Sequence, residues 1–434
     1  PGDALRILGD GVGSGTYTPS STTDGDGNVT ITSDAQTQAV EFTGLEPLEV
    51  SNLPSFTFIS PNSADIITVT AVTMSAVSMV AATVIRGTSG GVGFEELQVF
   101  DVTNLTLDLS SNDASGQDND NVRIVDTDPN NPTNTNPLRA TTELKTMLIN
   151  TGFGNDTIEL DGITNLALPN AGAVNEVLTV NLGEGTDRLI IDNSATDGAL
   201  DGSVGNDGVD LDAVNDIAAI TLAHDTTSPG APFTQLSYGT SRTASTALGT
   251  IRFTGDSILG EEAIFIGGAG NTVFDLSNWQ NDTDSKSTVV GGAGVDTVVG
   301  PNEVNPNQAV TWTVSSVDVT GNVTGQVTAL DFSQVENLEG GTGDDLFILP
   351  DDVNLAAAIA SIDGGTSGND TIDLGVFTTA LTTSVTARGT GNSGFTGSVI
   401  ETGGAETVVT GFNRIDGVLG GTRRHVESAA AQCW

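Results

Sequence analysis

The chain alternates short apolar and β-branched runs with polar turns over nearly its whole length. Within residues 1–110, the polar segment 23–28 stands between two alternating runs, a pattern typical of a hairpin turn. The uncharged stretch 66–85 comes nearest to a membrane span, but its Thr and Ser residues are interspersed with Val and Ala, which favours strands. The pattern therefore predicts an all-β protein that has no membrane-spanning segment.

Strand-like runs continue through the second half of the chain. Two stretches rich in Thr and Val, 308–314 and 381–386, are followed by glycine- and asparagine-containing turns at 320–322 and 389–392. Such turns between alternating runs predict two further hairpins.

Two polar insertions interrupt the strand pattern, at 111–137 and at 194–216. The first contains Asp113, Asp118 and Asp120, for which two interpretations are open. They belong either to a cation site or to a solvated loop, and we favour the loop.

Two nine-residue runs have the form Gly-Gly-x-Gly-x-Asp-x-apolar-x, at 291–299 and 340–348. The glycines allow the backbone to curl and to turn its carbonyl oxygens inward, and the aspartate adds a carboxylate beside them. The apolar residue two places further on then enters a strand. Oxygen ligands suit Ca²⁺, and this nonapeptide is the repeat unit of calcium-binding parallel β-helices.

Four degenerate copies accompany the two complete ones. The copies at 151–159 and 182–190 lack only the first glycine, and the copy at 267–274 has Thr272 in place of the aspartate. The copy at 364–372 carries one inserted serine.

The spacing of these copies is regular. The interval from Gly267 to Gly291 is the same as the interval from Gly340 to Gly364, and we call it the short interval. The interval from Gly267 to Gly340 is likewise the same as the interval from Gly291 to Gly364, and we call it the long interval. A supra-repeat of that length is indicated, with a looser earlier copy at about 152–266.

The short interval has the length of one solenoid coil. One coil of a β-helix takes about 20 residues or somewhat more. Successive glycine-aspartate turns separated by the short interval are therefore expected on the same corner, one coil apart.

On this arrangement Asp345 and Asp370 face each other across a strand spacing of about 4.8 Å. Two carboxylates at that distance repel each other unless a cation bridges them or one is protonated. We therefore predict a Ca²⁺ site between the turns 340–345 and 364–370. The Gly267/Gly291 pair offers only Asp296 and is expected to be weaker or empty.

The predicted ligand set combines glycine carbonyls with aspartate carboxylates. Asp363, which directly precedes the second turn, is included, and whether Asp156 and Asp187 stack is left open. The full set is Gly340, Gly341, Gly343, Asp345, Asp363, Gly364, Gly365, Asp370, Gly291, Gly292, Gly294, Asp296, Asp156 and Asp187.

The predicted fold is all-β, with parallel β-helix or solenoid-like repeats and inserted hairpins. A β-sandwich-like arrangement is an alternative for the N-terminal part. The predicted segments are 1–110, 111–150, 151–266, 267–339, 340–420 and an atypical tail at 421–434.

Composition narrows the classes of partner. The 434 residues include 13 Lys or Arg and 56 Asp or Glu, a formal charge of −43. Such a chain repels itself unless cations screen it, and it has no basic surface for nucleic acid. Cys433 is the only cysteine, which excludes an internal disulfide. The chain begins at Pro1 without a signal peptide, and we interpret it as a processed product or a segment of something longer.

The nonapeptides resemble the hemolysin-type (RTX-like) calcium-binding repeats of secreted bacterial proteins. The residue sequences of four segments resemble parts of giant bacterial surface proteins and adhesins: 332–345, 42–48, 94–97 and 103–106. The resemblance implies secretion to the medium or the cell surface, calcium-dependent folding and β-roll or β-helix architecture. Because the nonapeptides do not follow one another directly, isolated sites in a β-helix or a β-sandwich array fit better than a compact roll.

Catalytic chemistry finds little support in the sequence. His224 and His425 are the only histidines, the basic residues are scattered, and neither a nucleophile motif nor a zinc cluster occurs. Carboxylate pairs are too abundant for any one pair to indicate or exclude a glycosidase. We therefore predict that the protein is not an enzyme.

The leading hypothesis is a structural or adhesive extracellular protein with calcium-stabilised repeats. It would belong to a surface layer, a matrix fibre or a giant adhesin, and self-association head to tail into filaments is expected. The alternatives are a β-helix enzyme acting on polysaccharide and a carbohydrate-binding module. Extracellular glycans would then be partners, with Tyr17, Tyr238, Trp279 and Trp312 as candidate contact residues.

Overall fold

The computed structural model of the chain describes most of its residues. These are 4–33, 36–45, 47–62, 64–113, 118–125, 143–161, 177–183, 185, 187–192, 219–225, 233–239, 249–255, 262–267, 271–278, 286–303, 309–315, 319–325, 330–351, 359–389, 394–402, 407–420 and 424–428. The predicted insertion at 194–216, Trp279 and Cys433 lie outside the described residues. Contacts divide the chain into an N-terminal unit (1–217 with 225–263) and a C-terminal unit (218–224 with 264–434).

The regular secondary-structure elements of the described residues are almost all strands, which confirms the predicted all-β class. The one helical element among them is a single 3₁₀ turn, η1 (Ser110–Asn112). The strands belong to a mixed sheet system in which parallel and antiparallel pairs both occur. No helix in this part of the chain is long and apolar enough to cross a membrane.

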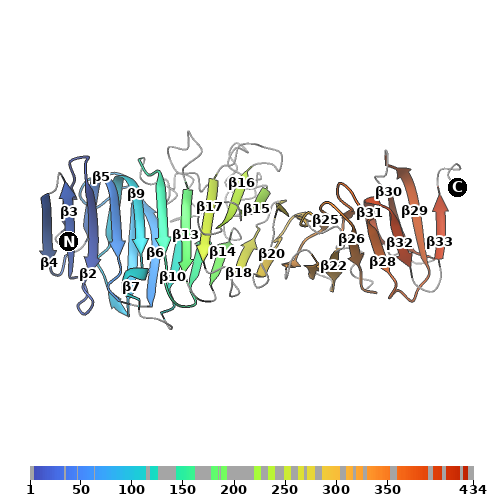
Figure 1. The fold of residues 1–434 in the computed structure, drawn as a ribbon, viewed down its shortest axis with the longest axis horizontal. Coiled ribbons are helices and arrows are strands. Elements are labelled where there is room, and N and C mark those ends of the chain that lie inside the picture. Colours follow the sequence, from blue (N-terminus) through green and yellow to red (C-terminus); the bar gives the residue numbers. More distant parts are fainter. Residues whose placement is uncertain are drawn as a thin grey trace. The chain divides into compact units, whose positions relative to one another are not determined.

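One parallel ladder runs through the N-terminal unit (Figure 1). Its apolar side chains stack in register, as Phe56 on Leu105 and Leu105 on Met147 show. All three are at most 1% exposed, so the ladder is held by a continuous row of core contacts. In order, its strands are β5 (Leu48–Ile59), β9 (Leu97–Asp108), β11 (Thr146–Asn150), β13 (Val177–Gly183) and β17 (Gly249–Gly255).

Strands that follow those of the first ladder along the chain, each after a turn, form a second parallel ladder. Val122 lies opposite Ile67 and Ile158, and Ile158 lies opposite Leu189. Each of these side chains is buried, whereas the residues directly before and after each of them along its own strand are partly or fully exposed. The strands are β6 (Asp65–Val72), β10 (Asn121–Val125), β12 (Thr157–Asp161) and β14 (Arg188–Asp192).

Hairpins interrupt the parallel ladders where the sequence predicted them. The polar segment 23–28 lies at the turn between β2 (Ser14–Pro19) and β3 (Gly27–Ser33), which pair antiparallel. β3 pairs in turn with β4 (Gln36–Phe42), and β2 also lies beside the second half of β5. The remaining strands of this unit are β1 (Leu5–Leu8), which pairs with β5, β7 (Ala82–Ser89), β8 (Val92–Gly93) and β16 (Phe233–Gly239), which pairs with β17.

The C-terminal unit repeats one pairing scheme along the chain. β19 (Val273–Asn278) pairs with β21 (Thr297–Val299), and β26 (Asp345–Ile348) pairs with β28 (Thr371–Leu374) in the same parallel sense. The predicted hairpins are confirmed as β22 (Val310–Val314) with β23 (Gly321–Thr324) and β29 (Leu381–Arg388) with β30 (Phe395–Glu401). β15 (Ala219–Asp225) pairs with β19 and precedes the first copy. The strands of that copy are β18 (Glu262–Ile266), β19 (Val273–Asn278), β20 (Lys286–Val290), β21 (Thr297–Val299), β22 (Val310–Val314), β23 (Gly321–Thr324) and β24 (Leu330–Ser333).

The second copy has the same order of strands and hairpin. It comprises β25 (Asn337–Glu339), β26 (Asp345–Ile348), β27 (Ser361–Asp363), β28 (Thr371–Leu374), β29 (Leu381–Arg388), β30 (Phe395–Glu401) and β31 (Thr407–Ile415). β32 (Gly417–Gly420) and β33 (Arg424–Ser428) follow and pair with β28 and β29. The long interval seen in the sequence thus corresponds to a repeated strand topology.

Glycine-aspartate turns that precede neighbouring paired strands stack on one another, and we call each such stack a column. The two copies place their glycine-aspartate turns in different columns. The turn before β21 lies against the residues before β25, because β21 pairs with β25. The turn before β26 lies instead between the loop before β22 and the turn before β28, because β26 pairs with both strands. Turns separated by the short interval therefore share a column, whereas turns separated by the long interval occupy equivalent places in neighbouring columns.

Candidate cation-binding turns

The turns that end at Asp345 and at Asp370 lie against each other, as the sequence predicted. The backbone N–H of Asp345 donates to Oδ1 of Asp370 at 3.0 Å. In the opposite direction, the backbone N–H of Asn369 donates to Oδ1 of Asp344 at 2.8 Å. A reciprocal pair of backbone-to-side-chain hydrogen bonds therefore joins the two turns.

This reciprocal pair is a recurrent feature of the molecule. It occurs twice more, with donor–acceptor distances of 2.7 or 2.8 Å: Thr272 to Asp296 with Val295 to Asn271, and Asp120 to Asp156 with Asn155 to Asn119. Single bonds of the same kind extend the series: Asp65 to Asp120, Asp156 to Asp187, Asp296 to Glu336, and Asp370 to Asp416.

These bonds define three columns of stacked turns. The N-terminal column has turns that end at Asp65, Asp120, Asp156 and Asp187. The first C-terminal column has turns that end at Thr272, Asp296 and Glu336, and the second has turns that end at Asp345, Asp370 and Asp416. Asp156 and Asp187, whose stacking the sequence left open, are neighbours in the first of these.

The carboxylates in the columns have a structural task that needs no metal. A turn interrupts the parallel ladder, so its backbone N–H groups lose their ladder acceptors. Leaving such a group buried and unsatisfied costs about 1–3 kcal/mol. Seven acidic side chains supply the missing acceptor for the turn beside them, which explains why these positions are acidic: Asp120, Asp156, Asp187, Asp296, Glu336, Asp370 and Asp416.

The glycines of the motif are required by close stacking. A Cβ on Gly340 would lie 2.4 Å from Oδ2 of Asp345 and 2.6 Å from the carbonyl oxygen of Gly364. Gly364 is confined in the same way by Asp370 and by the carbonyl oxygen of Arg414. Gly343 has a φ of 101°, which side chains other than glycine rarely adopt.

Neighbouring turns also approach closely at the later glycines of the motif. A Cβ on Gly368 would lie 1.8 Å from the carbonyl oxygen of Gly343, and one on Gly365 would lie 2.1 Å from that of Gly341. The Gly341 carbonyl accepts the backbone N–H of Thr366 at 3.0 Å. Since a carbonyl oxygen has two lone pairs, this bond still leaves it one acceptor position.

The carboxylates that end these turns are buried. Asp345 is 1% exposed, and its Oδ2 lacks a hydrogen-bond donor. Burial raises the pKa of Asp345 to about 8; the Trp312 indole opposes this rise, and the Asp370 carboxylate adds to it. Burial likewise raises the pKa of Asp370 and of Asp296 to about 7. Each of these groups therefore needs a proton or a cation near neutral pH.

Trp312 fixes the orientation of the Asp345 carboxylate. Its Nε1–H donates to Oδ1 of Asp345 at 3.1 Å, and the indole itself is completely buried. The ring stacks on Phe347 at a centroid distance of 5.4 Å and packs against Phe332 at 6.0 Å. Oδ1 is thereby committed to the indole, and Oδ2 is left available for another partner.

Asp363 differs from the other predicted ligands because its donors come from the protein. Its Oδ1 accepts Nε of Arg414 at 2.5 Å and the backbone N–H of Gly365 at 3.0 Å. Its Oδ2 accepts Nδ2 of Asn413 at 3.0 Å. A cation at Asp370 would have to compete with Arg414 for this carboxylate.

The predicted ligand set is thus distributed over all three columns. The second C-terminal column holds Gly340, Gly341, Gly343, Asp345, Gly364, Gly365 and Asp370 together. The first C-terminal column holds Gly291, Gly292, Gly294 and Asp296, and there Thr272 offers a backbone N–H in place of a carboxylate. Asp156 and Asp187 belong to the N-terminal column, whose other members, Asp65 and Asp120, the nonapeptide pattern did not predict.

The closest group of three carboxylates among the described residues lies elsewhere. Single oxygen atoms of Glu159, Asp161 and Asp192 lie within 4.8 Å of one another. Arg123 already forms ion pairs with Glu159 and Asp161. This cluster is therefore partly neutralised by the protein.

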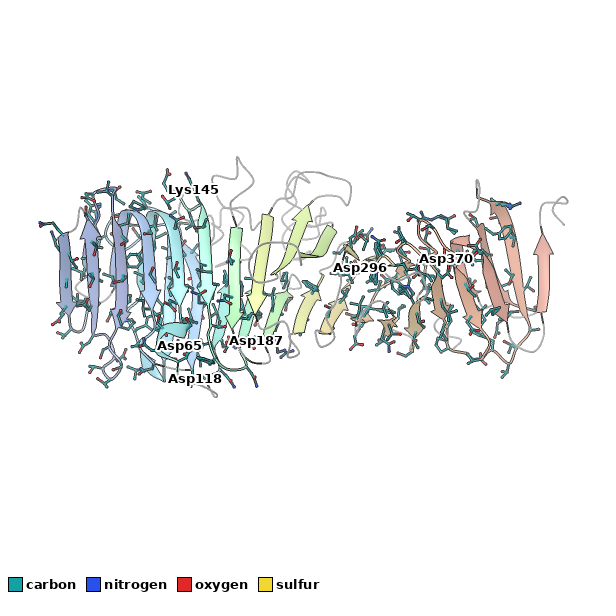
Figure 2. The ribbon with its side chains drawn as sticks, in the orientation of Figure 1. Asp65, Asp118, Lys145, Asp187, Asp296 and Asp370 are labelled. Atoms are coloured by element: carbon teal, nitrogen blue, oxygen red, sulfur yellow. The ribbon has the colours of Figure 1, made fainter. Side chains whose placement is uncertain are left out.

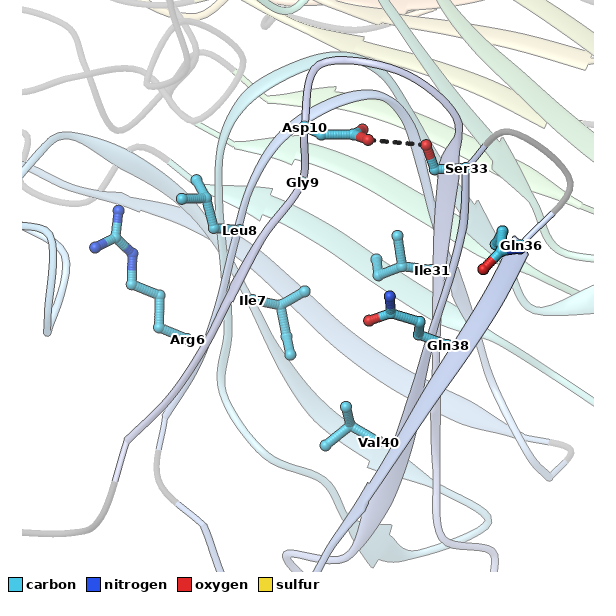
Figure 3. Close-up of a pocket in the computed structure, with 10 residues that line it drawn as sticks. All are labelled: Arg6, Ile7, Leu8, Gly9, Asp10, Ile31, Ser33, Gln36, Gln38 and Val40. Carbon is cyan, nitrogen blue, oxygen red and sulfur yellow. Dashed lines mark hydrogen bonds between the residues drawn. The ribbon is translucent and has the colours of Figure 1, made fainter.

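Two of the aromatic residues considered for glycan contact are not on the surface. Tyr17 and Trp312 are both 0% exposed, which contradicts their proposed role as stacking platforms. An open groove of about 490 Å³ lies beside β1, β3 and β4, and its lining includes Arg6, Gln38 and Val40 but no aromatic side chain (Figure 3).

Comparison with known proteins adds no further constraint. No family model matches the chain, and no curated protein sequence is significantly similar to it. The geometry of the turns is therefore the basis for the function proposed below.

Proposed function

We propose that this protein is an extracellular structural or adhesive module stiffened by calcium. In this proposal the parallel ladders are the coils of a β-solenoid, and Ca²⁺ binds where glycine-aspartate turns stack. The observation that carries the proposal is the buried Oδ2 of Asp345, which lies beside Gly340 and lacks a donor. A buried carboxylate oxygen in this state is costly unless a proton or a cation reaches it.

The residues around Asp345 have the donor chemistry that Ca²⁺ requires. They offer oxygen atoms only, from the carboxylates of Asp345 and Asp370 and from the carbonyls of the glycines beside them. When bound, the ion would supply positive charge to two acidic residues that adjoin through one hydrogen bond. Its effect would be to hold successive turns together.

A structural role agrees better with the burial of the acidic turns than catalysis does. Asp345, Asp370 and Asp296 are each at most 3% exposed. A polysaccharide chain cannot reach carboxylates that are covered to this degree. These residues therefore suit a stabilising ion rather than the acid and base of a glycosidase.

The calcium proposal is tested by unfolding the full chain in Ca²⁺ and in chelator at pH 7.5. Ca²⁺ should raise the melting temperature, and Asp345→Asn should remove part of that increase. Trp312 fluorescence should change during the Ca²⁺ titration, because the indole donates to the same carboxylate. Identical melting curves in Ca²⁺ and chelator would refute the proposal.

The matched control is Glu41→Gln. Glu41 is an exposed carboxylate on β4, so this variant removes one negative charge away from every turn column. It should retain the full calcium-dependent increase. An equal loss in both variants would mean that Ca²⁺ acts by general screening.

We further propose that copies of the chain associate through exposed strand edges. In the described part of the chain β4 pairs with β3 alone, and its residues before Phe42 are exposed. Leu8 and Val40 are also exposed, at 62% and 38%. An open edge with apolar side chains is a template for β-augmentation.

Sedimentation of the wild type and of Val40→Lys in millimolar Ca²⁺ tests this association. The wild type should form larger species, and the lysine variant should shift toward the monomer. A wild type that remains monomeric at high concentration would exclude association through this edge.

A further inference from the structure

The N-terminal column contains a cluster of carboxylates that lies mostly outside the nonapeptides. Asp65 and Asp120 end two of its turns, and neither turn carries the glycine pattern. The described residues between β9 and β10, 109–113 and 118–120, contribute two more carboxylates, Asp113 and Asp118. Figure 2 shows Asp65, Asp118 and Asp187 along one edge of this unit and Lys145 at the opposite edge.

Close contacts place the described residues 109–113 and 118–120 directly on the turn 151–156. Oδ2 of Asp113 accepts the backbone N–H of Phe153 at 3.2 Å. A Cβ on Gly154 would lie 2.1 Å from the carbonyl oxygen of Asp118. The two turns therefore bring Asp113 and Asp118 to the column formed by Asp65, Asp120 and Asp156.

Several oxygen atoms of this cluster are buried without a donor. They include Oδ1 of Asp113, Oδ2 of Asp120 and Oδ2 of Asp156. Asp120 and Asp156 are 2% and 0% exposed, so water is not a ready substitute for a ligand. These side chains therefore indicate a missing partner, in addition to the concentration of negative charge.

The ion pairs formed by Arg6, Arg86 and Arg123 do not supply that partner. Arg6 and Arg86 pair with Glu49 and Glu96, and Arg123 pairs with Glu159 and Asp161. Burial raises the pKa of Asp120 to about 9 and that of Asp113 to about 7, and neighbouring carboxylates add to both rises. The cluster thus has an excess of buried acid.

We infer that Asp65, Asp113, Asp118, Asp120 and Asp156 form a second divalent-cation site, specific for Ca²⁺, in the N-terminal unit. It shares Asp156 with the ligands predicted from the nonapeptides and therefore rests in part on the proposed function. Its other four carboxylates come from outside those repeats. Oxygen-only donors and a flexible ligand number favour Ca²⁺ over Mg²⁺ and over transition metals.

Binding requires the Asp113 side chain to move closer to the other four carboxylates. No three of these five residues have oxygen atoms within 4.8 Å of one another in the structure. Oδ1 of Asp120 is held by the N–H of Asp65, and Oδ1 of Asp156 by the N–H of Asp120. Asp113 lies outside this series and accepts the N–H of Phe153 through Oδ2, so its Oδ1, which lacks a donor, is the atom that moves toward the column.

The test uses the full chain, stripped with chelator and titrated with CaCl₂ by calorimetry. Hydrogen–deuterium exchange is followed in peptides that cover 64–72, 118–125 and 151–161, and in peptides that cover 340–374. Ca²⁺ should slow exchange in both groups of peptides. Asp113→Asn should weaken one Ca²⁺ site at least tenfold and abolish the protection of the N-terminal peptides alone.

Two further variants keep the test decisive. Asp120→Asn retains an oxygen acceptor for the Asp65 N–H and removes a charge, so it should also abolish N-terminal protection. Asp345→Asn should do the reverse, with loss of protection in 340–374 alone. Circular dichroism in chelator establishes that each variant is folded.

The outcomes separate this inference from the proposed function. Protection of 340–374 without protection of the N-terminal peptides would overturn the second site and leave the first intact. Unchanged calcium affinity at every site, together with unchanged N-terminal protection, in both Asp113→Asn and Asp120→Asn would also overturn it, because the cluster would then be neutralised by protons. Absence of protection in both groups would refute the proposed function as well.

Discussion

The carboxylate of Asp370 accepts the backbone N–H of Asp345 at 3.0 Å, so the two acidic residues meet as donor and acceptor. The hydrogen bond joins the two turns even though the Asp370 carboxylate also raises the pKa of Asp345. The same hydrogen-bond relationship joins Asp120 to Asp156 and Thr272 to Asp296. Asp370 contributes both an acceptor oxygen and a negative charge, and the first prediction separates the two.

Asp370→Ala should destabilise the chain by about 1–3 kcal/mol, because it leaves the Asp345 N–H buried without an acceptor. Asp370→Asn retains an oxygen acceptor and removes a buried charge, so in chelator at pH 8 it should be less harmful than alanine. Chemical denaturation of both variants measures the difference. Equal losses would show that the charge of Asp370, rather than its acceptor oxygen, stabilises the turn.

Gly340→Ala should destabilise the chain by about 1–3 kcal/mol through overpacking, because the new Cβ meets Oδ2 of Asp345 and the Gly364 carbonyl. The matched control is Gly411→Ala in β31, where the nearest atom to a Cβ is the Ala360 carbonyl oxygen at 3.8 Å. That variant should be tolerated. Thermal melts of the two variants in chelator would contradict this packing argument if Gly411→Ala were the more damaging.

The calcium-free chain should lose stability as the pH rises from about 4 to about 9. The folded pKa values of Asp370, Asp345 and Asp120 are raised to about 7, 8 and 9 from the ordinary value of 3.8. Between those limits the folded state binds more protons than the unfolded state, so the free energy of unfolding falls with increasing pH. Denaturant midpoints measured in chelator across this range test the sign.

Saturating Ca²⁺ should flatten that decline, because the ion binds the deprotonated carboxylates and offsets their burial. The difference between calcium and chelator should therefore be small near pH 5 and large near pH 8. A calcium effect that is independent of pH would contradict the assignment of the ion to these aspartates.

Trp312→Phe should destabilise the chain by about 1–3 kcal/mol, in part because Oδ1 of Asp345 loses the indole donor. The aromatic stack on Phe347 is partly retained by the new ring. A double-mutant cycle with Asp345→Ala, which removes the acceptor oxygen, isolates the hydrogen bond from the packing, and a coupling of about 1 kcal/mol is expected. Strictly additive losses would mean that Trp312 acts through packing alone.

The sequence was a good guide to strands and hairpins. Alternating apolar residues predicted the class, and turn residues placed the hairpins β2–β3, β22–β23 and β29–β30. The short interval between glycine turns placed Asp345 beside Asp370 correctly. The shift between columns was not predicted, because it depends on which strands pair, and one sequence contains no direct record of pairing.

The turn chemistry was only half predicted. The nonapeptide pattern found the aspartates but assigned them to a metal alone, because it does not report the N–H groups that a neighbouring turn presents. Asn119 and Asn155, each of which directly precedes an aspartate, were a usable signal. An Asn-Asp pair before a strand provides the two side chains of the reciprocal bond. Asp65 gave no such signal and became recognisable only from its partner Asp120.

The strands β18 to β24 form one copy of a pairing scheme and the strands β25 to β31 form the next, which has a consequence for how such a chain lengthens. The fourth and fifth strands of the first copy, β21 and β22, pair with the first and second strands of the next, β25 and β26. A further copy could pair with the second one in the same way, displaced by one column. Duplication of one such copy would therefore add strands without a new kind of strand pairing, and it would add acidic turns in a further column. Length and charge distribution would then be set by copy number, a quantity that recombination between repeats alters in a single step.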